Sequence, residues 1–140
     1  MTIEDATSSP ACWIEITCWK IYLPRAAPPE QVVGDFKAFV EKIRTKLPDV
    51  RIAIMSSGPS LDRFSSADKI KKLNQLIKEY VGQGKNLDYI DTFDAFMGPD
   101  GLPRPELYVA DKTHNSAEGY KIRVSLVKPY VEKFMNEENR

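Results

Sequence analysis

Apolar residues in this chain follow two alternating patterns: short continuous runs, and longer stretches in which they recur every three or four positions. A short run rich in β-branched and aromatic residues is typical of a buried strand, whereas three-and-four spacing is typical of an amphipathic helix. The patterns predict strands at residues 12–22, 50–55 and 87–91, and helices at residues 30–47, 66–81 and 116–134. Strand and helix therefore alternate three times along the chain.

Prolines and serines mark several ends of these elements. Pro28 and Pro29 open the first predicted helix, because proline is tolerated in the first helical turn. Ser65 or Ser66 is placed to cap the second helix with its hydroxyl. Pro129 falls inside the third predicted helix, where proline removes a backbone donor, so we expect a kink or a break there.

The alternation predicts the α/β fold class, with a parallel sheet in a three-layer α/β/α arrangement. We expect the larger aromatic side chains in its core rather than on a substrate-binding surface: Trp13, Trp19, Phe36, Phe39 and Phe93. Ligands of such sheets bind beyond the carboxyl ends of the strands. The loop at residues 56–60 leaves a strand at that rim, and we expect the loop at residues 111–114 to return to it.

Length and charge place limits on the function. The 140 residues suffice for one domain, which we place at residues 12–136 between a mobile tail (1–11) and a short C-terminal tail (137–140). Twenty basic residues balance twenty acidic ones, so we expect no nucleic-acid partner. No apolar stretch approaches the roughly 20 residues of a membrane span, and the acidic N-terminus leads into no signal peptide. We therefore expect a cytoplasmic protein.

The cysteines and the single histidine argue against a metal site. Cys12 and Cys18 lie too far apart along one predicted strand to form a disulfide, so we interpret them as buried free thiols. The chain contains no Cys-x-x-Cys pair and only one histidine, which leaves a zinc site without its usual ligands. We expect neither a metal nor an organic cofactor.

That histidine, His114, is the best candidate for chemistry. It follows Asp111 by three residues, on a loop immediately before the last predicted helix. An imidazole can take a proton from a hydroxyl nucleophile, and a carboxylate on its other nitrogen fixes the tautomer and stabilises the imidazolium. An Asp-x-x-His pair is common by chance, but here it stands on a loop and is followed by a longer motif.

Residues 108–120, which read Tyr-Val-Ala-Asp-Lys-Thr-His-Asn-Ser-Ala-Glu-Gly-Tyr, resemble the last conserved block of SGNH (GDSL-type) hydrolases. The helix start at residues 29–33 and the Pro59-Ser60 pair after a strand are also similar to that family. The resemblance covers residues 29–134 and implies a flavodoxin-like SGNH hydrolase fold. It further implies that Asp111 orients the imidazole and that His114 is the general base in hydrolysis of an ester.

Two parts of the family pattern are missing from the sequence. No Gly-Asp-Ser block, which would supply the nucleophilic serine, occurs in it. Residues 12–30 contain no glycine and no asparagine, so the oxyanion-hole block is not recognisable. We therefore expect the domain to be N-terminally incomplete. Ser56, Ser57 and Ser60 are the surrogate nucleophiles that the rim offers, although turn formation and capping explain them better.

Two hypotheses follow. In the first, the chain is an SGNH-type hydrolase domain that acts on a small ester, retains Asp111 and His114, and is weak or inactive alone. In the second, it is a non-catalytic remnant or interaction module that keeps the fold. Loss of a strand leaves an exposed sheet edge, through which the chain would form a homo-oligomer or bind a partner.

Overall fold

Within the part of the chain that the structure describes, three parallel strands form a sheet in the order β1–β2–β3. The computed structural model describes residues 11–14 and 27–138 of the chain. The strands are β1 (Ala11–Ile14), β2 (Arg51–Met55) and β3 (Leu87–Ile90). Because β2 pairs in parallel with both neighbours, it is the central strand of this sheet, and β1 and β3 are its outer strands.

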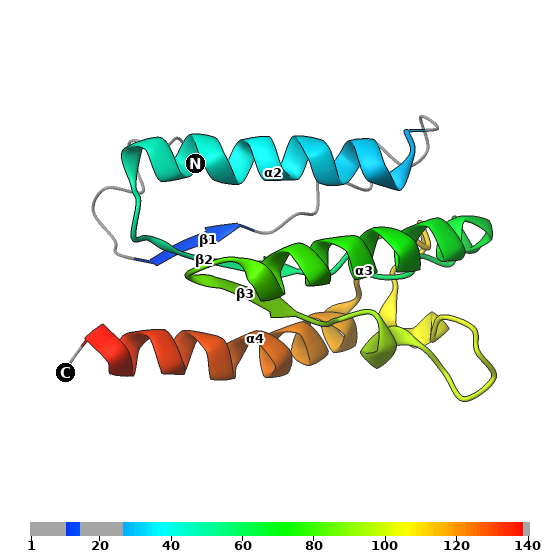
Figure 1. Ribbon diagram of the computed structural model, residues 1–140. Coiled ribbons are helices and arrows are strands. Elements are labelled where there is room, and N and C mark those ends of the chain that lie inside the picture. Colours follow the sequence, from blue (N-terminus) through cyan, green and yellow to red (C-terminus); the bar gives the residue numbers. More distant parts are fainter. Residues whose placement is uncertain (1–10, 15–26, 139–140) are drawn as a thin grey trace.

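Helices cover both faces of the sheet, which confirms the predicted three-layer α/β/α architecture. Helices α2 (Pro29–Lys46) and α3 (Ala67–Gln83) lie together on one side, and α4 (Ala117–Glu138) lies on the other (Figure 1). The alternation of side chains along β2 produces this division. Ile52 and Ile54 pack against α2 and α3, whereas Ala53 packs against Phe134 of α4.

The larger core lies between the sheet and the α2–α3 pair. Its buried helical residues recur at three-and-four spacing, as the sequence predicts: Val32, Val33, Phe36, Val40 and Ile43 on α2, and Ile70, Leu73, Ile77 and Val81 on α3. The core on the α4 side is smaller and contains Ala53, Ile90 and Phe134 as its buried members. The start of α4 packs Ile122 against a third cluster, formed by Phe96, Leu107 and Tyr108, while Tyr120 and Val124 of the same helix are exposed.

Three details of the prediction were wrong. Ser66 makes no side-chain cap bond, because it ends a 3₁₀ turn (Phe64–Ser66) that runs directly into α3. Phe39 is 42% exposed, since it lies one position outside the buried stripe of α2. Helix α4 continues through Pro129, so the break that was one of the two expected outcomes does not occur. Pro129 is on the exposed side of the helix, where water can bond the carbonyl that the proline ring leaves without a partner.

The predicted first strand can be compared with the structure only in part. Strand β1 occupies Ala11–Ile14, and the rest of the predicted strand, residues 15–22, lies outside the described residues. Cys18 and Trp19 lie there too. The side chains of Cys12 and Trp13 are likewise outside what the structure describes.

Buried polar groups join the carboxyl ends of β2 and β3. The Ser56 hydroxyl accepts a hydrogen bond from the Thr92 N–H (2.8 Å), and the Thr92 hydroxyl donates to the Ser56 carbonyl (3.1 Å). One residue further on, the Asn74 side chain of α3 accepts from the Ser57 N–H (2.9 Å) and donates to the Ser57 carbonyl (2.8 Å). These bonds fix the path of the chain as it leaves β2.

Replacement of Asn74 by alanine should destabilise the fold, because it leaves both backbone groups of Ser57 buried without a partner. We expect the free energy of unfolding to fall by about 2–4 kcal/mol, measured by urea denaturation. Gln75→Ala, at the exposed neighbouring position, is the matched control and should change stability by less than about 0.5 kcal/mol. Equal effects of the two substitutions would contradict this role for Asn74.

Candidate active site

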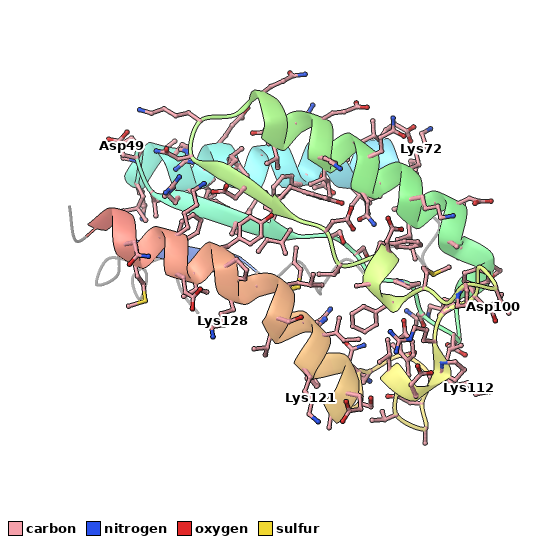
Figure 2. All side chains as sticks on the ribbon, turned by 90° about the horizontal axis from the view of Figure 1, so that it is seen from below. Asp49, Lys72, Asp100, Lys112, Lys121 and Lys128 are labelled. Carbon is pink, nitrogen blue, oxygen red and sulfur yellow. The ribbon has the colours of Figure 1, made fainter. Side chains whose placement is uncertain are left out.

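The loop that carries Asp111 and His114 is closed by a short antiparallel bridge between Tyr108 and Asn115. On either side of the bridge, the Val109 N–H donates to the His114 carbonyl and the Ser116 N–H donates to the Leu107 carbonyl, each at 2.9 Å. The loop therefore begins and ends at fixed points. Lys112 lies at its tip, at the same end of the molecule as Asp100 (Figure 2). Asp49, which precedes β2, lies at the other end of the molecule.

The Asp111 carboxylate is held by three hydrogen bonds. Its Oδ1 accepts the backbone N–H groups of Thr113 and His114, both at 2.9 Å, and its Oδ2 lies 2.5 Å from Nδ1 of His114. Donors that bond a carboxylate stabilise its charged form. The imidazole first, and then the two backbone groups, lower the pKa of Asp111 from its ordinary value of 3.8 to about 2.

The ionised carboxylate determines which nitrogen of His114 carries the proton. A carboxylate can only accept hydrogen bonds, so Nδ1 is the donor in the 2.5 Å contact. In the neutral ring, Nε2 is then left as the basic nitrogen. None of the described residues bonds Nε2, and the His114 side chain is 76% exposed. The pair thus presents an oriented base to a reactant that approaches from solvent.

Three contacts brace this loop against the segment that follows β2. The Tyr108 hydroxyl donates to the Pro59 carbonyl at 2.7 Å. The Lys112 carbonyl accepts from the Ser60 hydroxyl at 3.2 Å and from the Asp62 N–H at 3.4 Å. Burial raises the pKa of Tyr108 to about 12, so its hydroxyl keeps its proton and remains a donor. The contacts confirm that the two loops share the carboxyl rim of the sheet.

The structure places the three rim serines in buried positions, and two of their hydroxyls already have structural partners. Ser56 bonds Thr92, and Ser60 bonds the Lys112 carbonyl. Ser57 is held through its backbone by Asn74. Ser60 is the one among them that reaches the Asp111–His114 loop, but it does so through the loop's backbone and not through the imidazole.

Gly119, in the first turn of α4, brings the helix close to the loop. A Cβ atom at this position would lie 2.4 Å from the Leu107 carbonyl oxygen and 3.0 Å from the Cβ of Asn115. The backbones of α4 and of the 3₁₀ turn at Pro105–Leu107 therefore touch where a side chain would normally stand. The neighbouring Glu118 is exposed and pairs with Lys121, as expected of a charge in the first helical turn.

Among residues 11–14 and 27–138, no three histidine, cysteine, aspartate or glutamate side chains are grouped to hold a metal ion. In the same residues, none of the helices combines the length and apolarity of a membrane span.

Sequence reasoning did not identify the residues that support the pair. The sequence presents Tyr108 only as part of a motif, and Ser60 as a turn or capping residue that is less favoured as a nucleophile. Asn74 and Thr92 were not singled out. A polar residue within an apolar stripe is the one sequence signal that points to Asn74, since it lies four residues after Ile70 and three before Ile77, both of which are buried on α3.

The three bonds to Asp111 have a measurable consequence for its titration. We expect the carboxyl carbon of Asp111 to titrate in an NMR experiment with a midpoint near 2. Because the folded pKa lies below the ordinary one, the carboxylate contributes stability above pH 3.8, and this contribution is lost as the pH falls through about 2. His114→Ala should raise the midpoint, since it removes the largest cause. An unchanged midpoint would contradict the arrangement.

Gly119→Ala should disturb the site without touching either member of the pair. The added methyl group meets a backbone carbonyl, so α4 or the loop has to shift, and we expect a loss of about 1–3 kcal/mol in the free energy of unfolding. Amide chemical shifts of Asp111–Asn115 should move with it. Gly82→Ala on α3, where a Cβ meets nothing within 4 Å, is the control and should leave these shifts in place.

Comparison with solved structures supports the fold. The chain aligns with a carbohydrate esterase family 3 protein from Talaromyces cellulolyticus with a TM-score of 0.75 and 14% identity, over 94% of this chain and 61% of that one. It aligns with an acetyl esterase mutant that holds an acetate ion with a TM-score of 0.75 and 14% identity, over 95% and 62% of the two chains. A protein from Bacteroides fragilis assigned as an acylhydrolase gives a TM-score of 0.67 and 18% identity, over 78% and 54%.

At these identities the likeness establishes the fold alone, and the chain spans between 53% and 62% of the length of the structures it matches. No curated protein matches the sequence at a significant level. The sequence profile of the GDSL-like lipase/acylhydrolase family, however, matches residues 23–122, which are more than half of the chain and include both Asp111 and His114. The chain therefore belongs to the GDSL-like lipase/acylhydrolase family.

Proposed function

We propose that this chain is an ester-hydrolase domain in which Asp111 and His114 are the proton-transfer half of the catalytic site. The observation that carries the proposal is the 2.5 Å contact between Asp111 Oδ2 and His114 Nδ1. None of the described residues forms a hydrogen bond with the other ring nitrogen, Nε2. The membership in an acylhydrolase family supports ester bonds as the substrate class.

In the proposed reaction, a serine hydroxyl attacks the ester carbonyl while Nε2 of His114 takes the hydroxyl proton. The imidazolium, stabilised by the Asp111 carboxylate, then gives the proton to the departing alkoxide, which leaves as an alcohol. Water hydrolyses the acyl-serine in the same way: Nε2 accepts a proton from the water and returns it to the serine, and the carboxylic acid is released. Each step uses His114 first as a base and then as an acid.

In this proposal the nucleophile is none of the three rim serines. The hydroxyls of Ser56 and Ser60 are buried in hydrogen bonds with other partners, and their release would leave Thr92 or the Lys112 carbonyl without those bonds. A serine and the oxyanion-hole donors would come from a segment outside the described residues or from another chain. Each oxyanion donor is worth about 10²–10³ in rate, so the described part alone should be a weak catalyst.

Hydrolysis of p-nitrophenyl acetate by the purified chain tests the role of His114. An oriented imidazole acts on this activated ester as a general base even without a serine, so we expect a low rate that falls about tenfold or more in His114→Ala. Asp111→Asn should fall between the two, because an amide no longer stabilises the imidazolium. Asp68→Asn, an exposed carboxylate at the start of α3, is the matched control and should retain the wild-type rate.

A fluorophosphonate probe, which labels reactive serines, tests whether one of the rim serines is the nucleophile. We expect Ser56, Ser57 and Ser60 to remain unlabelled, as read by mass spectrometry of the intact chain and its peptides. Labelling of one of them, together with loss of turnover in its alanine variant, would overturn that statement and leave the role of His114 in place. Equal rates for wild type and His114→Ala would instead favour a non-catalytic module that keeps the family fold.

A further inference from the structure

The imidazole of His114 is a nucleophile as well as a base, since both properties belong to the lone pair on Nε2. In a complete hydrolytic triad, a serine hydroxyl bonds this nitrogen and stands between the ring and the ester carbonyl. In the part of the chain that the structure describes, no hydroxyl bonds Nε2, and the His114 side chain is 76% exposed. An ester carbonyl can therefore approach the ring directly.

The Asp111 carboxylate prepares the ring for such an attack in two ways. It accepts the Nδ1 proton at 2.5 Å, so the lone pair of the neutral ring is on Nε2. Attack on a carbonyl also gives the ring a positive charge, which a fixed carboxylate stabilises. The carboxylate stays ionised at neutral pH, since its hydrogen bonds with the imidazole and with two backbone N–H groups lower the pKa of Asp111 to about 2.

The leaving group decides which esters the ring can cleave by itself. A nucleophile displaces a group readily when that group is not a much stronger base than the nucleophile. The reference pKa of an imidazolium is about 6.5 and that of a phenol about 10, whereas an alcohol is a far weaker acid. Attack on an alkyl ester therefore reverses, and cleavage is confined to acyl donors with an acidic leaving group, such as aryl esters with an electron-withdrawing substituent.

We propose that His114 is itself the acyl acceptor when the chain meets an acyl donor with an acidic leaving group. The proposal rests on the role of the Asp111–His114 pair given above, and it adds a covalent step to proton transfer. In this step Nε2 attacks the ester carbonyl, the bond from the acyl carbon to the aryl oxygen breaks, and the aryloxide leaves with the bonding electrons. The acyl group is then bound to Nε2, and the cationic ring is paired with Asp111 through Nδ1.

Water completes the reaction and regenerates the site. It attacks the acyl carbon, the bond from that carbon to Nε2 breaks, and its electrons return to the ring as the lone pair. The carboxylic acid and one proton are released, and the proton passes to solvent. The neutral ring keeps its Nδ1 proton in the hydrogen bond to Asp111, ready for another acyl donor.

The reaction of the purified chain with p-nitrophenyl acetate tests the covalent step. We expect acid-quenched samples to carry one acetyl group on the peptide that contains His114, read by mass spectrometry of the intact chain and its peptides. In the first turnover, nitrophenolate should be released at nearly the same rate in D₂O as in H₂O, because no proton moves in the attack. General-base attack by water is slower in D₂O, since a proton is then in transfer.

Hydroxylamine detects an acyl intermediate even where it is hydrolysed too fast to accumulate. It should divert the acetyl group to acetohydroxamate without raising the rate at which the chain releases nitrophenolate, once the uncatalysed reaction is subtracted. Hydroxamate that forms only in proportion to a faster release would show that no acyl intermediate exists.

The control variant moves the single histidine of the chain away from its carboxylate. His114→Ala alone should lose the adduct. His114→Ala combined with Ser125→His places an imidazole on an exposed position of α4. Its neighbours three and four residues away include no acid: Lys121, Ile122, Lys128 and Pro129. This variant should form about fivefold less adduct than the wild type, as expected for loss of an exposed charge pair. Equal amounts would show that any surface histidine reacts in this way and would overturn the proposal.

The outcomes separate this proposal from the one on which it rests. A rate that falls in His114→Ala, with no acyl intermediate and a slower release in D₂O, would overturn the covalent step and leave His114 as a general base. An acetyl group on a serine would also overturn it, and would identify the nucleophile of the serine mechanism. Equal rates for the wild type and His114→Ala would contradict both proposals.

Discussion

The arrangement of the site depends on the buried amide of Asn74. A strand that ends in the interior leaves backbone groups that water cannot reach. After β2, these groups are the N–H and the carbonyl of Ser57. The two hydrogen bonds from the Asn74 side chain satisfy both groups and thereby fix the position of the residues that follow. Pro59 and Ser60 then stand where Tyr108 and Lys112 can bond them, so a contact on α3 determines the position of a loop that precedes α4.

Much of the fold was predictable because its core follows simple periodicity. The buried stripe on α2 and the apolar run that forms β2 are local patterns, and the structure confirms them. The failures occurred where a neighbouring element decides. Whether Phe39 is buried depends on the width of the surface that α2 faces, and whether Pro129 breaks α4 depends on which side of that helix meets water.

The candidate site likewise has a part that the sequence predicts and a part that depends on contacts between distant segments. Asp111 and His114 are three residues apart, so the sequence alone places them together, and the two backbone bonds to Asp111 are equally local. The supports are not local: Tyr108 bonds a residue 49 positions away, and Ser60 one 52 positions away. From its place in the sequence, Ser60 is a candidate for catalysis as well as for a turn. The fold shows that its hydroxyl bonds the Lys112 carbonyl and so supports the loop.

The backbone of Lys112 has a consequence for how this loop can vary in evolution. Its φ of 59° lies in the left-handed region, and its carbonyl accepts both Ser60 and Asp62. The position is thus constrained by its main chain, while its long side chain extends from the surface. Glycine, asparagine and aspartate suit such a backbone, whereas valine and isoleucine strain it. Substitution at this position is therefore constrained by the conformation of the peptide, because the backbone bonds to Ser60 and Asp62 do not involve the lysine side chain.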